Sequence, residues 1–294
     1  MPEGDTIHQA RLRLLPILEH STVVRFWVRK IRGYRPRAGQ RIETVRVHGK
    51  HLLVDFAPAL TLQVHLGLGG WWNVEPGVTD DDNILAQHRR DPRLRVYLAT
   101  DRGIAVCYGA PTIQTFVRGD DDGAPLDGTS VPSALTPLTN LGPDLRVDDD
   151  GRSAVVEQAV ARTRARRPGS ELMMDLLLDQ QVAAGAGNVY KSEVLFLERI
   201  WPFTPVSELD DKTLETVFKT ASRLLWINSQ RADSQRTTTP FSGNFSDLHG
   251  GVFVYQRFRA PCRRCETPIK RTYSGRYGRS TYWCPRCQRE PGKR

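Results

Sequence analysis

The chain has 294 residues, and its 42 Lys and Arg against 33 Asp and Glu give a formal net charge of +9. Hydrophobic residues make up 39% and charged residues 26%, which is typical of a globular protein and argues against intrinsic disorder. No apolar run approaches the roughly 18 residues of a membrane span, and the N-terminus lacks the apolar core of a signal peptide. We therefore expect a cytoplasmic protein with an anionic partner and no membrane association.

The first part of the chain, residues 1–118, predicts a β-sandwich domain that carries one N-terminal helix. Apolar residues recur at helical spacing over residues 5–19. Turn signals such as Asp101-Arg-Gly103 then separate short runs with strand character. These runs are Val23–Val28, Arg41–Val47, His51–Phe56, Leu62–Leu66, Arg95–Leu98 and Ile104–Tyr108.

The second part predicts a helical domain over residues 144–233, after a linker at residues 119–143 that is rich in Asp, Gly, Pro, Ser and Thr. The expected helices are Ser153–Arg166, Glu171–Asp179 capped by Ser170, Val189–Arg199 capped by Asn188, and a long helix from Asp210 or Asp211 to about Ser229. Residues 234–250 are polar and aperiodic, which indicates a second linker.

Four of the five cysteines form two C-x-x-C pairs. The pairs are separated by 18 residues, a spacing typical of a zinc site in which each pair is a tight turn and the intervening residues form a hairpin. Four thiolates fill a tetrahedral ion, so one structural zinc and no catalytic metal is expected in a zinc finger at residues 250–290. The predicted ligands are Cys262, Cys265, Cys284 and Cys287, and the remaining Cys107 is expected to be a buried thiol.

Positive charge is concentrated at the C-terminal end of the chain. Residues 251–294 contain twelve basic and two acidic residues, interleaved with aromatic residues such as Phe258 and Tyr273. A run of charged residues is often simply a solvated surface. Here the mixture of basic and aromatic residues around a predicted metal site favours nucleic-acid binding.

The N-terminal sequence Met-Pro-Glu is a candidate source of a nucleophile. Removal of Met1 would expose Pro2 as a secondary amine, which titrates near 8 and is therefore partly a free base at neutral pH. Attack of this amine on an aldehyde-like sugar carbon gives an iminium, the electron sink that an elimination needs.

Several motifs in one order resemble the formamidopyrimidine-DNA glycosylase/endonuclease VIII family of base-excision repair enzymes, over essentially the whole chain. The motifs are Met-Pro-Glu-Gly-Asp-Thr-Ile7, His48-Gly-Lys50, His65-Leu-Gly-Leu68-Gly-Gly70, Leu141-Gly-Pro143, Gly185-Ala-Gly187-Asn188-Val-Tyr-Lys-Ser-Glu193 and Gly278-Arg279-Ser-Thr-Tyr-Trp-Cys284. The resemblance implies a β-sandwich, a helix-two-turns-helix domain and a C-terminal zinc finger, with damaged DNA as the partner.

The resemblance also implies three catalytic residues. Pro2 matches the nucleophile that attacks C1′ of the damaged nucleotide, and Glu3 matches the acid/base residue that helps to open the sugar. Lys50 matches a lysine that contacts DNA phosphate and assists proton transfer. By itself, Lys50 would be equally consistent with a solvent-facing strand lysine.

Three further residues match the family's DNA contacts. A base must leave the stack before a glycosylase can reach it; Leu68 matches the apolar residue that enters the vacated space, although it could be a core residue. Asn188 and Arg279 match residues that hold phosphate beside the flipped nucleotide, although Asn188 could serve only as a helix cap. Backbone N–H groups at the helix start around Gly187 are also expected to bind phosphate.

The sequence departs from the family pattern at several positions. Many members have a second glutamate where this chain has Thr6, and Gly109-Ala-Pro-Thr112 stands where the oxidised-purine branch has an arginine and a phenylalanine. Together with Gly4, these differences favour the endonuclease VIII branch. We expect a monomeric DNA glycosylase and AP lyase that acts by β,δ-elimination, prefers oxidised pyrimidines and needs no organic cofactor.

Two alternatives remain open. One is a non-catalytic protein that binds damaged DNA on the same scaffold, although DNA binding alone does not require an N-terminal proline. The other is a glycosylase that prefers 8-oxoguanine and formamidopyrimidine lesions.

Overall fold

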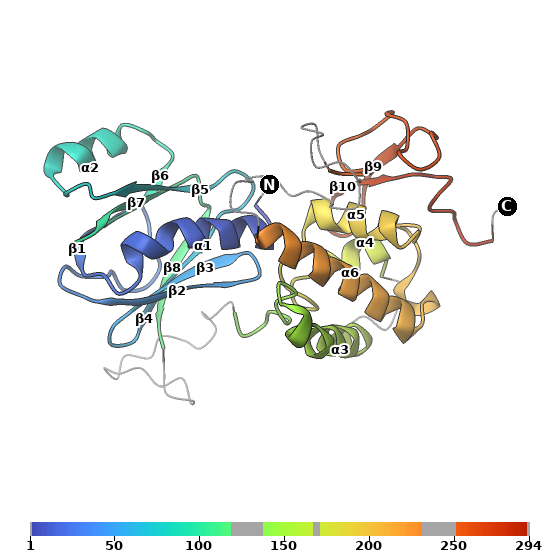
Figure 1. The fold of residues 1–294 in the computed structure, drawn as a ribbon, viewed down its shortest axis with the longest axis horizontal. Coiled ribbons are helices and arrows are strands. Elements are labelled where there is room, and N and C mark those ends of the chain that lie inside the picture. Colours follow the sequence, from blue (N-terminus) through green and yellow to red (C-terminus); the bar gives the residue numbers. More distant parts are fainter. Residues whose placement is uncertain (1, 119–137, 167–170, 231–250, 293–294) are drawn as a thin grey trace. The chain divides into compact units, whose positions relative to one another are not determined.

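The computed structural model describes residues 2–118, 138–166, 171–230 and 251–292. The chain forms two compact units: an N-terminal unit of residues 1–2 and 7–139, and a C-terminal unit of residues 3–6 and 140–294 (Figure 1). Each unit has its own hydrophobic core. Of the predicted linkers, residues 119–137 and 234–250 lie outside the described residues.

The N-terminal unit is the predicted β-sandwich. One antiparallel sheet has the strand order β1 (Val23–Val28), β6 (Leu94–Thr100), β7 (Gly103–Tyr108), β5 (Trp71–Pro76). The other has the order β2 (Ile42–His48), β3 (His51–Phe56), β4 (Leu60–His65), β8 (Thr112–Val117). Side chains of both sheets and of helix α1 (Gly4–Leu18) form one core, which includes Ile7, Leu14, Val54 and Leu98.

Three elements of this unit were not predicted. Helix α2 (Asp82–Arg89) begins at the N-cap Asp81, whose side chain accepts the Ile84 N–H at 2.7 Å. Strand β5 is only partly buried and ends at a proline, and strand β8 buries polar residues, so neither shows a hydrophobic alternation. In β8, Gln114 is buried because its amide donates to the Gln63 Oε1 at 2.7 Å.

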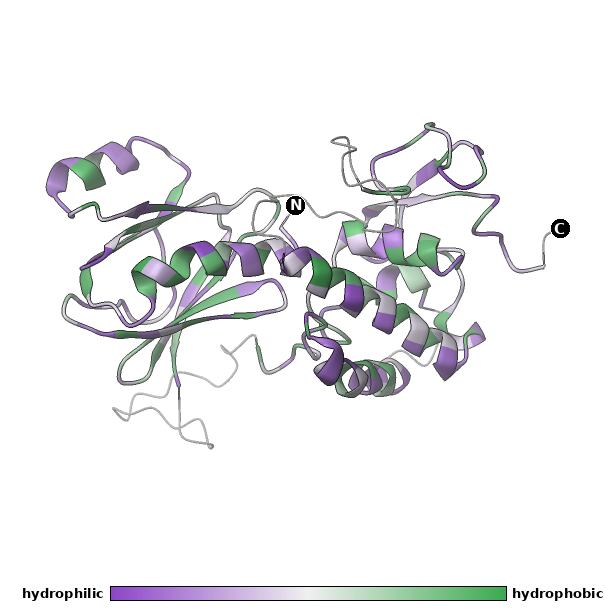
Figure 2. Cartoon of the chain, in the orientation of Figure 1, coloured by the Kyte–Doolittle hydropathy of each residue, from purple (hydrophilic) through white to green (hydrophobic). Residues whose placement is uncertain are grey.

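The C-terminal unit contains helices α3 (Asp149–Arg166), α4 (Met173–Leu176), α5 (Asn188–Leu197) and α6 (Asp211–Ser229), together with the short 3₁₀ helix Val206–Glu208. Hydrophobic and hydrophilic residues alternate along α6, which buries one side in the core (Figure 2). As predicted, Asp210 caps α6, accepting the Thr213 N–H at 2.8 Å.

The predicted helix Glu171–Asp179 is wrong, because only the four residues of α4 are helical. The Glu171 carbonyl accepts the Val206 N–H at 2.8 Å and Leu172 forms a bridge with Pro205, so an extended pairing replaces the first helical turn. The proposed cap Ser170 lies outside the described residues.

The last part of the chain forms the hairpin of β9 (Lys270–Ser274) and β10 (Arg279–Trp283). Strand β10 packs against α5, and Phe196 of α5 joins a small core with Phe253, Ile269 and Tyr282. Cys262 and Cys284 are themselves part of this small core.

Candidate functional site

The Glu3 side chain lies at the start of α5, within the C-terminal unit. Its Oε2 accepts the Gly187 N–H at 2.8 Å, and its Oε1 accepts the Val189 N–H at 2.9 Å. Both N–H groups belong to the first turn of a helix, which has no internal acceptors for them and carries a partial positive charge. The helix start therefore stabilises the negative charge of Glu3, which is completely buried.

A Cβ atom at residue 187 would lie 2.5 Å from the Glu3 carboxyl carbon, so a larger residue there would displace the carboxylate from its present position. The expectation that N–H groups at this helix start bind phosphate is therefore wrong for Gly187 and Val189, which both donate to Glu3. The sequence could not show this, because the carboxylate comes from the other end of the chain.

Asn188 was expected to cap α5, and this expectation is wrong. The N-cap is Gly187, and Asn188 is the first helical residue. Its side chain instead donates to the Ser280 Oγ at 3.1 Å and accepts from the Lys191 Nζ at 2.7 Å. Asn188 thus connects α5 to β10, on the hairpin that carries Arg279.

Lys191 and Tyr255 were missed by the sequence reasoning. Lys191 is 1% exposed, and its Nζ donates to the Ser280 carbonyl and to the Thr281 Oγ1, both at 2.9 Å. Burial raises the pKa of Tyr255, and a hydrogen bond with Asn188 opposes this shift. The sequence did not indicate that Lys191 is buried, because a lysine on a helix is usually exposed.

Glu193 joins α5 to the segment before the cysteines. Its carboxylate accepts the N–H groups of Phe253, Val254 and Tyr255 at 2.6–2.9 Å. Because Glu193 is 1% exposed, these bonds hold the start of the cysteine-bearing segment firmly on the helix.

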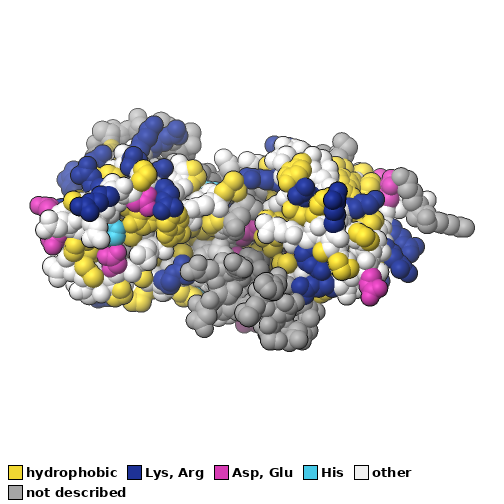
Figure 3. Space-filling model, turned by 90° about the horizontal axis from the view of Figure 1, so that it is seen from above, with side chains coloured by type: hydrophobic (Ala, Val, Ile, Leu, Met, Phe, Trp, Pro, Cys, Tyr) yellow, Lys and Arg dark blue, Asp and Glu magenta, His cyan; other side chains and the backbone are white. Residues whose placement is uncertain are grey.

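Arg279 begins β10 next to the turn of the hairpin, where Gly278 has a positive φ of 57° and its N–H donates to the Gly275 carbonyl. The Arg279 side chain is exposed. On the face of the C-terminal unit seen in Figure 3, Lys and Arg side chains lie among hydrophobic ones. Such a surface suits a polyanion that also offers flat apolar groups.

In the N-terminal unit, Lys50 lies in the two-residue turn between β2 and β3, not within a strand. Gly49 has a φ of 55°, which suits the first position of such a turn. Burial is the main cause that lowers the pKa of His51 to about 3, and the charge of Lys50 contributes. The lysine therefore stands beside a neutral histidine. Pro2, also grouped with this unit, is half-buried.

Leu68 is not a core residue, because 61% of it is exposed. It lies in the loop between β4 and β5, where the Gly67 N–H donates to the His65 Nδ1 at 3.2 Å and the Gly70 N–H donates to the Leu66 carbonyl at 2.9 Å. These bonds hold the loop in shape and leave an apolar side chain in solvent, which suits contact with another molecule.

The four paired cysteines come together at the base of the hairpin. All four Sγ atoms lie within 4.8 Å of one another, with Cys265 to Cys284 at 3.4 Å and Cys262 to Cys287 at 3.9 Å. A metal about 2.3 Å from four thiolates places them about 3.8 Å apart, so this group fits one tetrahedral ion. The fifth cysteine, Cys107, is buried as expected, and burial raises the pKa of its thiol.

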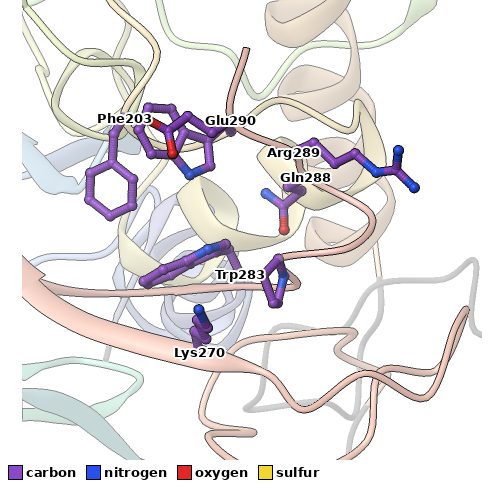
Figure 4. A pocket seen from close by; sticks show the side chains of 8 residues that line it. Phe203, Lys270, Trp283, Gln288, Arg289 and Glu290 are labelled. Atoms are coloured by element: carbon purple, nitrogen blue, oxygen red, sulfur yellow. The ribbon is translucent and has the colours of Figure 1, made fainter. Parts of the chain in front are cut away.

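A pocket of about 490 Å³ opens at the same end of the hairpin as the cysteines, bordered by Trp201, Phe203 and Trp283 (Figure 4). Lys270 lies beside Trp283, and Arg289 extends away from it. The lining residues include none of the site residues above. In the described part of the chain, no helix combines the length and apolarity needed to cross a membrane.

Comparisons with known proteins agree with this geometry. Residues 1–111 match the family model of the formamidopyrimidine-DNA glycosylase N-terminal domain, and residues 141–238 match that of the formamidopyrimidine-DNA glycosylase H2TH domain. The chain is 34% identical to a probable endonuclease 8 2 of Streptomyces coelicolor, over 100% of this chain and 96% of the relative. It is 33% identical to the DNA-(apurinic or apyrimidinic site) lyase Nei2 of Mycolicibacterium smegmatis, over 98% and 99%. The crystal structure of the MutM (Fpg) protein from Thermus thermophilus superposes with a TM-score of 0.73 at 25% identity, covering 98% of this chain and 99% of that one.

Proposed function

This chain belongs to the formamidopyrimidine-DNA glycosylase/endonuclease VIII family, and we propose that it removes oxidised bases from DNA and cleaves the resulting abasic site. The observation that carries the proposal is that the start of α5 holds the Glu3 carboxylate. Glu3, which follows Pro2 in the chain, is thereby fixed beside Asn188. A relative at 33% identity is named as an abasic-site lyase.

In the proposed reaction, the Pro2 nitrogen attacks C1′ of the damaged nucleotide and the bond from C1′ to the base breaks. The base leaves with a proton, and the new C–N bond becomes an iminium after the sugar ring opens. Loss of a C2′ proton then expels the 3′-phosphate, and a second elimination expels the 5′-phosphate.

Glu3 and Lys50 supply the proton transfers in this proposal. Glu3 is well placed to shuttle a proton at the sugar, because it is adjacent to the nucleophile in the chain and its position is fixed by backbone donors. As a carboxylate it first takes the proton that the Pro2 amine loses on attack, and it then passes this proton to the ring oxygen of the sugar. Lys50 assists and holds a phosphate. Because Lys50 lies in the turn, its ammonium is more accessible to a ligand than it would be from the middle of a strand.

Asn188 and Arg279 hold the phosphates beside the flipped nucleotide, and Leu68 fills the space that the base vacates. Arg279 offers a planar set of donors that suits phosphate. The exposure of Leu68 supports this role, because burying an apolar side chain between bases offsets part of the cost of unstacking.

We further propose that the four-cysteine group holds one structural zinc ion. Four thiolates leave no open position for water, so the ion would support the hairpin and take no part in bond breaking. Through the hairpin, it would keep Arg279 in place.

The proposed preference for oxidised pyrimidines rests on the surroundings of Leu68. Gly109-Ala-Pro-Thr112 lies directly against its loop, since a Cβ at Gly67 would come within 2.7 Å of Pro111 and one at Gly109 within 3.1 Å of the Gly69 carbonyl oxygen. This compact turn offers neither the arginine nor the phenylalanine of the oxidised-purine branch.

Borohydride trapping tests the function. A covalent complex with DNA that contains an abasic site, together with excision of an oxidised pyrimidine, would support the proposal. Binding of damaged DNA without trapping would favour the non-catalytic alternative, and faster excision of 8-oxoguanine would overturn the preference.

A further inference from the structure

Lys191 is a buried cation in the middle of the C-terminal unit. Its Nζ has three partners at 2.7–2.9 Å: the Asn188 Oδ1, the Ser280 carbonyl and the Thr281 Oγ1. Two of these partners belong to β10, and Ser280 is the neighbour of Arg279. One side chain of α5 thus holds both the Asn188 amide and the strand that carries Arg279.

All three partners present lone pairs to Lys191. The Asn188 amide uses its N–H to donate to the Ser280 Oγ, which fixes its oxygen toward Lys191. The Thr281 hydroxyl donates toward the Met174 sulfur, so its oxygen is free to accept. An ammonium has three N–H donors and satisfies all three partners, whereas a neutral amine has two and would direct its lone pair at an oxygen.

We propose that Lys191 is a positioning residue for DNA, whose charged form aligns the Asn188 side chain and the Arg279 strand to receive the phosphates beside the lesion. The proposal rests on the proposed function for the identity of the ligand. It assigns no contact between Lys191 and DNA, because the ammonium is already fully bonded within the protein.

The charge of this lysine is only marginally retained at neutral pH. Burial lowers its pKa from 10.5 to about 7. The carboxylates of Asp175 on α4 and Glu3 before α1 oppose this shift, and Arg279 on β10 adds to it. Phosphate bound near Arg279 would add negative charge and favour the ammonium.

DNA binding is therefore expected to depend on pH in one direction. Well below pH 7, Lys191 is almost fully charged and contributes no pH dependence. Above pH 7, the free protein loses the proton and binding must restore it, so the Kd is expected to rise up to about tenfold per pH unit.

The test measures the Kd for a duplex with a tetrahydrofuran abasic-site analogue from pH 6 to pH 9. This analogue has no aldehyde carbon, so Pro2 cannot form an iminium with it. Lys191→Arg stays charged throughout and is expected to remove the rise in Kd above pH 7. Lys191→Met is expected to bind at least tenfold more weakly than wild type at pH 6. Lys219→Met is the matched control on α6, where the lysine is exposed, and should keep the wild-type profile.

An identical pH profile in wild type and folded Lys191→Arg would overturn the proposal. If neither Lys191 variant folds, calorimetry of the wild-type protein at pH 8, in buffers of different ionisation enthalpy, decides the question. Uptake of close to one proton on binding supports the proposal, and no uptake overturns it. Failure of the proposed function would look different, because borohydride trapping would then be absent although the duplex is bound with this pH dependence.

Discussion

The Glu3 carboxylate accepts a hydrogen bond at 2.8 Å from the backbone N–H of Gly187, a residue 184 positions later in the chain. The start of α5 therefore holds Glu3, the residue that follows Pro2, in a fixed position. Thr6 completes the arrangement at the start of α1, where its hydroxyl accepts the Glu3 N–H at 2.8 Å. Where many family members have a second glutamate, this chain has a residue that caps the helix.

The nucleophile can be tested through the N-terminus. One residue added before Pro2 turns its amine into an amide, which cannot attack C1′, so borohydride trapping should fall to background. Pro2→Gly keeps a primary amine and should retain weak lyase activity. Undiminished crosslinking in the extended protein would show that another amine is the nucleophile.

Glu3→Gln is expected to lose base excision, because an amide cannot deliver a proton, while cleavage of a preformed abasic site partly survives. The amide also turns an NH₂ group toward a backbone N–H, which should reduce the free energy of unfolding by about 1–3 kcal/mol. Single-turnover excision and thermal unfolding measure both effects. Excision at the wild-type rate would remove Glu3 from the mechanism, and Asp5 would be examined next.

Leu68→Ala should reduce excision at least tenfold without affecting the fold. Because the side chain is 61% exposed, the expected change in stability is within about 0.5 kcal/mol. The buried Leu62 on β4 is the matched control, where the same substitution should cost about 2–5 kcal/mol. Unchanged excision by Leu68→Ala on duplex DNA would refute its insertion between bases.

Arg279→Ala should keep the metal and the fold but weaken DNA binding regardless of sequence, and the salt dependence should become shallower by about one ion. Excision should fall as well, since the phosphate lies beside the flipped nucleotide. Arg289→Ala removes the same charge from an exposed position in the same unit. Equal and small effects of the two substitutions would mean that Arg279 is an ordinary surface charge.

Cys284→Ser should release the metal and disorder the hairpin, because three thiolates bind a structural zinc much more weakly than four. Metal analysis should show less than one zinc per chain, and DNA binding should fall at least as far as in Arg279→Ala. Cys107→Ala changes a cysteine in the other unit and should leave the metal content at one. Full zinc content in Cys284→Ser would exclude a four-cysteine site.

Features set by local spacing could be predicted from the sequence. The cysteine pairs, the hairpin between them, the Asp210 cap and most strands of the sandwich follow from patterns that span a few residues. The order of motifs was likewise enough to indicate the family. In each case the physical cause, such as a turn, a cap or an alternation of apolar residues, acts between neighbours in the chain.

Only the tertiary structure decided the rest, because its causes act between distant residues. The pairing of Glu171 with Val206 shortened a predicted helix, and the Glu3 carboxylate took the N–H groups that seemed available to phosphate. The largest difference concerns Lys191, which looks like a surface lysine on a helix. Its burial against Ser280 and Thr281 depends on how a hairpin almost ninety residues later packs on α5, and no local pattern contains that information.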